Sequence, residues 1–223
     1  MSHLTADAPA IALGAGVGLA AGTYTPWAVR RAQRDAAERD RPDLAYASTP
    51  GWLIAILAAA FGSLVGARFG LTAGLPAYLY LAAIAPTLAA VDAAVHRLPD
   101  RVLLPAYPVG MVLLAFAAWR MDDGGPLWRA LLAGALLFVL FLAVALVAPT
   151  GSLGFGDVKL SGLVGGYLGF LGWNTLLRGM TIAFVSAAVY VLARRLVRRD
   201  QHGQLLPLGP TLLFGTLVAV IAS

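Results

Sequence analysis

The sequence predicts an all-α fold, a polytopic transmembrane helical bundle of about eight spans. The chain of 223 residues is 60% hydrophobic and only 12% charged, whereas soluble domains carry about 25% charged residues. Its mean hydropathy is +0.80. Apolar segments alternate with shorter polar ones, and most of them reach the roughly 17–25 residues that cross a bilayer. We therefore expect a lipid bilayer around the protein, because lipid removes the need for a polar exterior.

The apolar segments give the expected elements in order. We expect spans near residues 8–29, 52–65, 71–91, 102–119, 127–147, 160–173, 176–192 and 205–222. The second and sixth segments are short for a span, so the total of eight is approximate. Residues 1–29 thus form the first span, residues 30–51 a basic linker, and residues 52–223 the main membrane domain. No Lys or Arg precedes the first span, which argues against a cleaved signal peptide.

The distribution of basic residues predicts the orientation in the membrane. With eight spans, one side of the membrane receives these twelve: Arg30, Arg31, Arg34, Arg39, Arg41, Arg97, Arg101, Lys159, Arg194, Arg195, Arg198 and Arg199. The other side receives these four: Arg68, Arg120, Arg129 and Arg178. Because positive charge accumulates on the cytoplasmic side, both termini are expected outside. The same arginine-rich pattern at span ends favours a membrane role over nucleic-acid binding.

Glycines recur at four-residue spacing in two of the expected spans. Gly14, Gly18 and Gly22 follow this spacing in the first span, and Gly162 with Gly166 and Gly165 with Gly169 in the sixth. Small residues at this spacing let helices approach closely in lipid. The pattern therefore predicts helix packing, since the lysine and strand of a phosphate-binding loop are missing.

Two acidic residues stand directly against long apolar segments on the predicted cytoplasmic side. Asp92 follows the third span, and Asp157 precedes the sixth. Asp100 is considered below, and the other eight acidic residues lie in expected solvated segments: Asp7, Asp35, Glu38, Asp40, Asp43, Asp122, Asp123 and Asp200. A carboxylate at a span end usually faces the bundle interior. Each aspartate alone is equally well explained as a solvated helix end, but together they indicate a shared site.

Two carboxylates that share one site cannot both ionise easily, so one of them carries a proton. The ionised member can activate a water, and the protonated member can donate a hydrogen bond to a scissile carbonyl. This is the chemistry of an aspartic protease, and it requires neither a metal nor a cofactor. The chain contains no cysteine, which excludes thiol nucleophiles and cysteine metal sites. Because such a pair titrates as a unit, the sequence assigns the base role to neither aspartate.

The residues that follow Asp92 have expected structural roles. The Leu-Pro-Asp sequence that ends at Asp100 indicates a turn at Pro99, with Asp100 as N-cap of the fourth span. His96 lies four residues from both Asp92 and Asp100, so an unbroken helix could present the three to a metal. Pro99 makes an unbroken helix improbable, and we expect no metal site here.

The residues around Asp157 are expected to shape its surroundings. Gly154 and Gly156 would let the backbone bend sharply and bring a peptide close to the carboxylate. Lys159 is the only lysine of the chain. It could extend its amine to the membrane interface or attract an acidic group of a substrate, and the sequence does not favour either.

These segments resemble the motifs of the type IV prepilin peptidases. Asp92-Ala-Ala-Val-His-Arg-Leu-Pro-Asp100 is similar to their first motif, and Gly154-Phe-Gly-Asp-Val-Lys-Leu160 to their Gly-x-Gly-Asp-x-Lys-Leu motif. Leu206-Pro-Leu-Gly-Pro210 is similar to their C-terminal Pro-Phe-Gly-Pro segment, with Leu208 in place of Phe. The resemblance covers residues 81–223 and, more loosely, the first span.

The resemblance implies a membrane aspartyl endopeptidase of the bacterial cytoplasmic (inner) membrane. Asp92 and Asp157 would be the catalytic pair, on the cytoplasmic side. Members of the family remove the short basic leader of prepilins and pseudopilins, which is followed by an apolar membrane helix. Many members also N-methylate the new N-terminus and carry a cysteine-containing domain after the first span. Here residues 30–51 contain no cysteine, so we expect cleavage without N-methylation.

Two alternatives remain at the level of the sequence. A small proton-coupled transporter would use membrane carboxylates, but it would be expected to hold them near mid-span. A non-catalytic assembly factor of a pilus or secretion machine would tolerate the loss of either aspartate. The sequence gives neither the oligomeric state nor the natural substrate.

Overall fold

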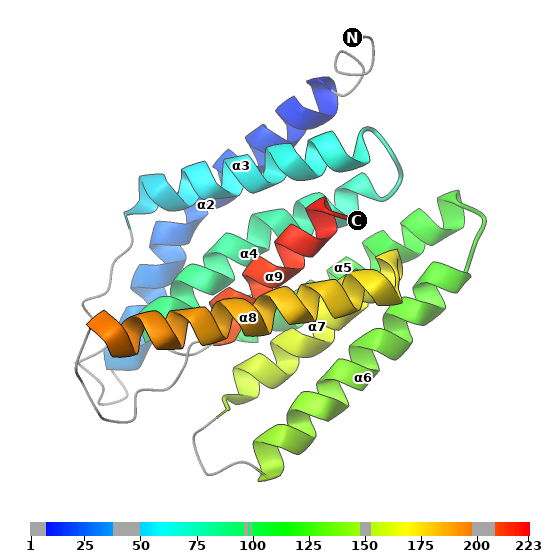
Figure 1. The fold of residues 1–223 in the computed structure, drawn as a ribbon. Coiled ribbons are helices and arrows are strands. Elements are labelled where there is room, and N and C mark those ends of the chain that lie inside the picture. Colours follow the sequence, from blue (N-terminus) through cyan, green and yellow to red (C-terminus); the bar gives the residue numbers. More distant parts are fainter. Residues whose placement is uncertain (1–7, 38–49, 96–97, 99, 148–152, 198–207) are drawn as a thin grey trace. The chain divides into compact units, whose positions relative to one another are not determined.

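The computed structural model describes residues 8–37, 50–95, 98, 100–147, 153–197 and 208–223. Every regular element in these ranges is a helix, so the all-α prediction is confirmed for the described part of the chain (Figure 1). The helices are α2 (Ala8–Ala37), α3 (Gly51–Phe69), α4 (Leu75–Val95), α5 (Asp100–Arg120), α6 (Gly125–Val147), α7 (Phe155–Leu171), α8 (Trp173–Val197) and α9 (Leu208–Ile221).

Five of these helices are long and apolar enough to cross a membrane, namely α3, α4, α5, α6 and α8. The chain is therefore a multi-pass membrane protein. The other three helices differ in length, with 30 residues in α2, 17 in α7 and 14 in α9. The total of eight spans remains a prediction.

Three helix boundaries differ from the sequence expectation by five residues or more, and one of them is the end of α8 at Val197, where the span was expected to end at residue 192. Helix α2 continues to Ala37, eight residues past the expected end of the first span, because the alanines and arginines there are good helix formers. Helix α7 begins at Phe155, whereas the sixth span was expected from residue 160. The polar segment before the sixth span was thus expected to extend to Lys159, but it ends at Gly154, the N-cap of α7. Polarity indicated where lipid ends, but a helix can continue through polar residues that are solvated.

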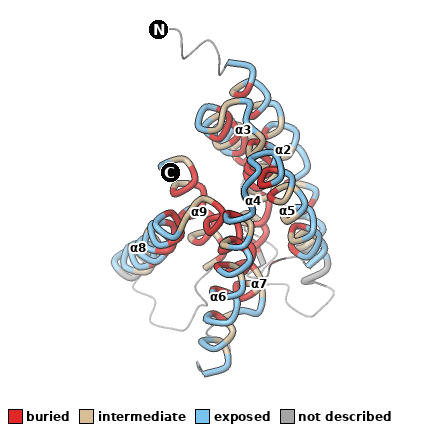
Figure 2. Tube along the Cα trace, turned by 90° about the vertical axis from the view of Figure 1, so that its right-hand side faces the viewer, coloured by how far each residue is buried: buried red, intermediate tan, exposed pale blue. Residues whose placement is uncertain are grey.

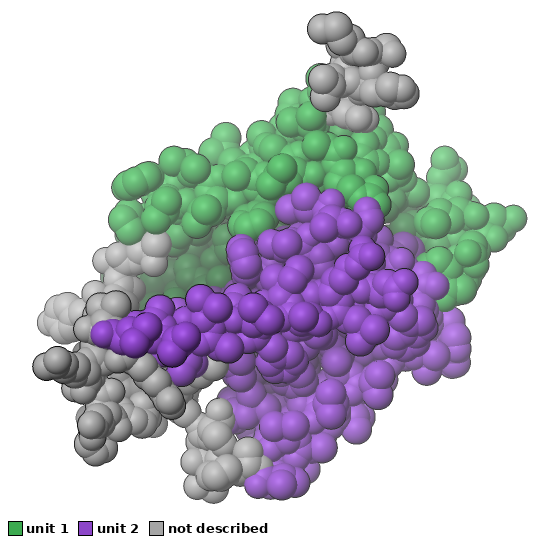
Figure 3. Space-filling model, in the orientation of Figure 1, with its two compact units in different colours: residues 1–127 green, residues 128–223 purple. Residues whose placement is uncertain are grey.

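The chain divides into two compact units, residues 1–127 and residues 128–223, which Figure 3 colours separately. Unit 1 contains α2 to α5, and unit 2 contains nearly all of α6 together with α7 to α9. This division falls inside the segment that was expected to form one membrane domain.

Close backbone contact between α2 and α3 forms one side of unit 1. A Cβ atom added at Gly14 would overlap the backbone of Gly62, and one added at Gly18 would overlap the backbone of Ala58. Gly66 lies in the same way against Ala10. The two helices thus run antiparallel, and the packing predicted from the glycine spacing of α2 is confirmed.

A buried hydrogen bond joins α2 to α4 in unit 1. The hydroxyl oxygens of Thr25 and Thr87 lie 2.6 Å apart, and Thr25 also donates to the Ala21 carbonyl at 3.2 Å. Both threonines are buried, at 0% and 3% exposure. A polar pair that is satisfied internally costs little within a bilayer, so this bond fixes the register of α2 on α4.

Helix α7 is the interior helix of unit 2. All of its residues from Asp157 to Phe170 are buried except Lys159, whereas α8 is largely exposed (Figure 2). The α7 glycines face α6: a Cβ atom at Gly165 would lie 2.7 Å from the Ala133 carbonyl oxygen. A helix that is apolar on all sides is expected to lie inside a bundle, and small residues allow α6 to approach it closely.

Arg129 of α6 caps the C-terminal end of α7. Its Nε donates to the Gly169 carbonyl at 2.7 Å, and its Nη2 donates to the Phe170 carbonyl at 2.8 Å. The amide of Gly172, whose φ is +148°, donates to the Leu168 carbonyl at 3.1 Å. These carbonyls belong to the last turn of a helix, where no partner within the helix is available. The arginine therefore satisfies acceptors that would otherwise be costly in lipid.

We expect Arg129→Gln to lower the free energy of unfolding by about 2–3 kcal/mol, because two charge-assisted hydrogen bonds are lost. Thermal or denaturant unfolding in detergent would measure the loss. Arg178→Gln is the matched control, since Arg178 is exposed on α8 and the same charge is removed. Equal stability of the two variants would contradict the capping role of Arg129.

Candidate active site

Asp92 lies in the last turn of α4, within unit 1. Its side chain is buried, at 4% exposure. On its own helix it continues the stripe of Leu81, Ala85 and Leu88, which are at most 1% exposed. These residues precede it by eleven, seven and four positions, as one helix face requires. The carboxylate therefore points to the interior, as predicted for a functional acid at a span end.

Helix α2 packs against the C-terminal end of α4, the helix end that carries Asp92. Ala28 and Val29 of α2 form one buried cluster with Val91 and Ala94 of α4. At roughly 100° of rotation per residue, Val91 and Ala94 lie on a different face of α4 from Asp92, so α2 packs against the neighbouring face of this helix end. The extension of α2 beyond the expected span strengthens this contact, because Ala32 also packs against the cluster.

Asp157 is the third residue of α7, within unit 2, and it is buried at 9% exposure. Gly154 is the N-cap, and its carbonyl accepts the Asp157 amide at 3.0 Å. The Asp157 Oδ2 atom lies 3.6 Å from the position that a Cβ atom of Gly154 would occupy. The carboxylate thus turns back over the start of α7, where the exposed amides of the first turn favour a negative charge.

The expectation that Gly154 and Gly156 make a sharp bend is wrong. Gly154 is extended, with φ −77° and ψ 143°, and Gly156 lies inside α7. Neither residue has a positive φ. A Cβ atom at 154 would make only an ordinary van der Waals contact with the Asp157 carboxylate, so the structure shows no steric need for glycine there.

The structure places the remaining predicted residues around the two aspartates as follows. Asp100 is exposed and is the first residue of α5, one position later than the expected N-cap. Lys159 is half-buried on α7, two residues after Asp157 and so on a different face of the helix. Pro99 and His96 lie outside the described residues. In the described part of the chain, no group of three His, Cys, Asp or Glu side chains could hold a metal.

Ser161 links α7 to α6 one helical turn after Asp157, and it escaped the sequence analysis. It follows Asp157 by one helical turn, is fully buried, and its Oγ lies 2.8 Å from the Val158 carbonyl oxygen and 3.2 Å from that of Leu137 on α6. The hydroxyl thus ties α7 to α6 directly below the carboxylate. A serine in an apolar helix signals a hydrogen bond, but only the structure shows which carbonyls accept it. The structural role of Arg129 was missed as well, because the sequence analysis counted it only among the basic residues on the predicted outer side.

The candidate site therefore has two halves, each at the end of an interior helix. Asp92 lies at a C-terminal helix end in unit 1, and Asp157 at an N-terminal helix end in unit 2. Each carboxylate is buried. The convergence of the two halves remains a prediction.

Comparisons with known proteins all point to one protein family. The sequence profile of the type IV leader peptidase family matches residues 79–192, just over half of the chain and inclusive of both aspartates. The prepilin leader peptidase/N-methyltransferase of Bacillus subtilis is 30% identical over 157 residues, which cover 70% of this chain and 59% of the relative. The proteins of the same name from Pseudomonas putida and Escherichia coli are 27% and 28% identical and cover 60% and 59% of this chain.

The matched regions cover only 45–59% of these three relatives, so the chain spans about half of their length. No solved structure matches the chain. The family assignment thus depends on the sequence match across residues 79–192 and agrees with the two motifs that contain Asp92 and Asp157. The chain belongs to the type IV leader peptidase family.

Proposed function

We propose that this protein is an aspartyl endopeptidase that removes the basic leader from prepilin-like or pseudopilin substrates at the cytoplasmic face of the membrane. One observation carries the proposal: the two buried aspartates, Asp92 and Asp157, lie at the ends of interior helices inside the region that matches the family. The relatives are named for prepilin leader peptidase activity, and the excess of positive charge on one predicted side supports a cytoplasmic site.

The helix ends support different roles for the two carboxylates. Asp157 lies in the first turn of α7, where the helix dipole stabilises an ionised side chain, and Asp92 lies in the last turn of α4, where it disfavours one. We assign the base that activates water to Asp157. Asp92 then carries the proton and donates a hydrogen bond to the scissile carbonyl, which withdraws electrons from the carbonyl carbon. Attack by water and protonation of the leaving amine complete the cleavage without a covalent intermediate.

The positions of the two aspartates argue against the transporter alternative. A proton-coupled carrier would be expected to hold its carboxylates near the middle of the membrane. Both aspartates lie in terminal turns, which suits a substrate whose cleaved bond is at the membrane surface.

We expect membranes that contain the protein to cleave a prepilin-like substrate with a basic leader and an apolar helix, and to add no methyl group. Residues 30–51, which follow the first expected span, contain no cysteine, and this supports peptidase activity alone. Mass spectrometry of the product would measure both the loss of the leader and any methylation in the presence of a methyl donor. An intact substrate would disprove the peptidase proposal, and a methylated product would disprove its second part.

A further inference from the structure

One exposed face of α2 carries two aromatic and two cationic side chains in a row. They are spaced by three, four and three residues, which is the spacing of a single helix face. These four residues, here called the α2 stripe, are Tyr24, Trp27, Arg31 and Arg34. All four are exposed, because α2 packs on α4 through a different face, which includes Ala28.

The side chains of the α2 stripe contact one another. The ring centroids of Tyr24 and Trp27 lie 5.0 Å apart, and the guanidinium carbon of Arg31 lies 5.2 Å from the centroid of the Trp27 ring. A guanidinium in this position is attracted by the ring. Because its N–H donors lie in the guanidinium plane, the contact orders Arg31 without using them. Such a fork of donors matches the oxygens of a phosphate.

The C-terminal end of α2 is strongly basic. Arg30, Arg31 and Arg34 occur within five residues and are exposed, and the first acidic residue of α2 is Asp35. The sequence analysis places this helix end on the cytoplasmic side. An exposed cluster of arginines at the end of a span attracts anionic lipid headgroups, and the cytoplasmic leaflet is the one that carries them.

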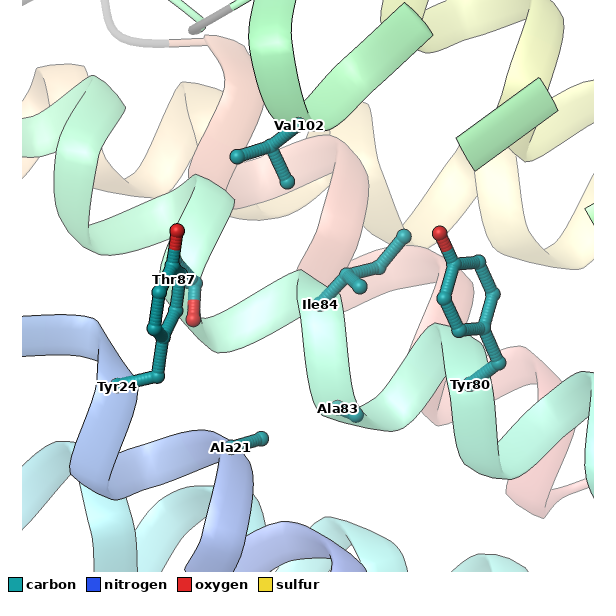
Figure 4. A pocket seen from close by; sticks show the side chains of 7 residues that line it. All are labelled: Ala21, Tyr24, Tyr80, Ala83, Ile84, Thr87 and Val102. Carbon is teal, nitrogen blue, oxygen red and sulfur yellow. The ribbon is translucent and has the colours of Figure 1, made fainter. Parts of the chain in front are cut away.

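The other end of the α2 stripe borders an apolar groove. The groove has a volume of about 210 Å³ and lies between α2, α4 and α5, all within unit 1. Tyr24 forms one side of it, and Ile84 and Val102 project into the space (Figure 4). Its lining is almost wholly apolar. A peptide backbone would find few partners there for its polar groups, whereas an acyl chain needs none.

The groove, the aromatic rings and the arginines follow one another in the order of the parts of a phospholipid. At 1.5 Å per residue, Arg31 lies about 10.5 Å beyond Tyr24 along α2, and Arg34 about 15 Å. Tryptophan favours the level of the headgroups, and arginine extends its charged end towards water. An acyl chain that enters the groove beside Tyr24 therefore brings its phosphate to the arginines.

We propose that unit 1 binds one anionic phospholipid, with its phosphate on Arg31 and Arg34 and an acyl chain in the groove beside Tyr24. The α2 stripe lies outside residues 79–192, which match the family profile. The inference does not depend on the peptidase proposal, and either can fail without the other.

The first test measures lipid binding to the full chain in detergent by native mass spectrometry. Phosphatidylglycerol should bind at least about tenfold more tightly than phosphatidylcholine with the same acyl chains. The double variant Arg31→Gln, Arg34→Gln should weaken phosphatidylglycerol binding about 25-fold, since each cation at the membrane surface contributes about fivefold.

The matched control for this variant is Arg68→Gln, Arg120→Gln. It removes two exposed arginines of unit 1 from the last turns of α3 and α5, and its affinity for phosphatidylglycerol should be unchanged. Equal affinity for the two lipids, or an equal loss in the two double variants, would overturn the proposal. Arg31 and Arg34 are exposed, so their replacement should leave the fold intact, which thermal unfolding would verify.

The second test addresses the acyl chain. Ala83→Leu places three more carbon atoms in the groove and should weaken phosphatidylglycerol binding about three- to tenfold, whereas Ala60→Leu, at an exposed position of α3, should not. Glycerol phosphate carries the phosphate without the chains and should not displace the lipid. Displacement by glycerol phosphate would indicate a simple anion site, and normal lipid binding by folded Ala83→Leu would place the chain elsewhere. Either result would overturn the proposal, and the arginine variants keep it falsifiable if Ala83→Leu does not fold.

Discussion

Asp92→Asn and Asp157→Asn should each reduce leader cleavage by about a thousandfold or more. An amide has nearly the shape of a carboxyl group but can neither take the proton from water nor supply one to a carbonyl, and proton transfer of this kind contributes about 10²–10⁴ to a rate. Both side chains are buried, and asparagine has nearly the same volume as aspartic acid, so the packing around each position should be kept. Cleavage of a co-expressed prepilin, followed by gel shift or mass spectrometry, measures the effect.

Asp122→Asn is the matched control for these variants. Asp122 is exposed in the turn between α5 and α6 and has φ 52°, a backbone conformation that asparagine adopts readily. The same charge is removed, and cleavage should be unchanged. Retention of activity by Asp92→Asn or by Asp157→Asn would rule out the two-aspartate mechanism, whereas loss of activity by all three variants would point to a general effect of charge.

The same two variants test the assignment of roles. If Asp92 carries the proton, the infrared band of a protonated carboxyl group should disappear in Asp92→Asn and remain in Asp157→Asn. The opposite result would reverse the roles that the helix ends support and leave the aspartyl mechanism itself intact.

Gly18→Leu should lower the free energy of unfolding by about 3 kcal/mol or more. A side chain at this position would meet the backbone of Ala58 and Ala59 on α3, and backbone atoms cannot move aside as the end of a flexible side chain can. Forcing extra atoms into a packed contact typically costs 1–3 kcal/mol, and more where the contact cannot relax. Thermal unfolding in detergent and the amount of folded protein in the membrane measure the change.

Gly16→Leu provides the control on the same helix. Gly16 is exposed, and a Cβ atom added there has no neighbour within 4 Å. Its stability should be unchanged or slightly raised, because leucine favours the helical state more than glycine does. If Gly16→Leu were as damaging as Gly18→Leu, the α2–α3 contact would not be the cause.

Much of the fold follows from hydropathy because lipid imposes a simple rule. A segment that crosses a bilayer must be apolar and helical, so the apolar runs locate all eight described helices to within a few residues at most boundaries. The rule fails at the start of α7 and at the ends of α2 and α8, where helices continue through polar residues. Hydropathy reports the environment of a residue, whereas the helix boundary also depends on capping and on local propensity.

The sequence by itself determined the class of protein, the family motifs and the two aspartates that are proposed to act. These conclusions need only residue types and their spacing along the chain. Tertiary structure alone decided which helix each glycine meets, that Arg129 caps α7, and that Ser161 ties α7 to α6 one turn after Asp157. The physical reason is that such contacts join residues far apart in sequence, and their partners are set by how helices pack rather than by any local pattern.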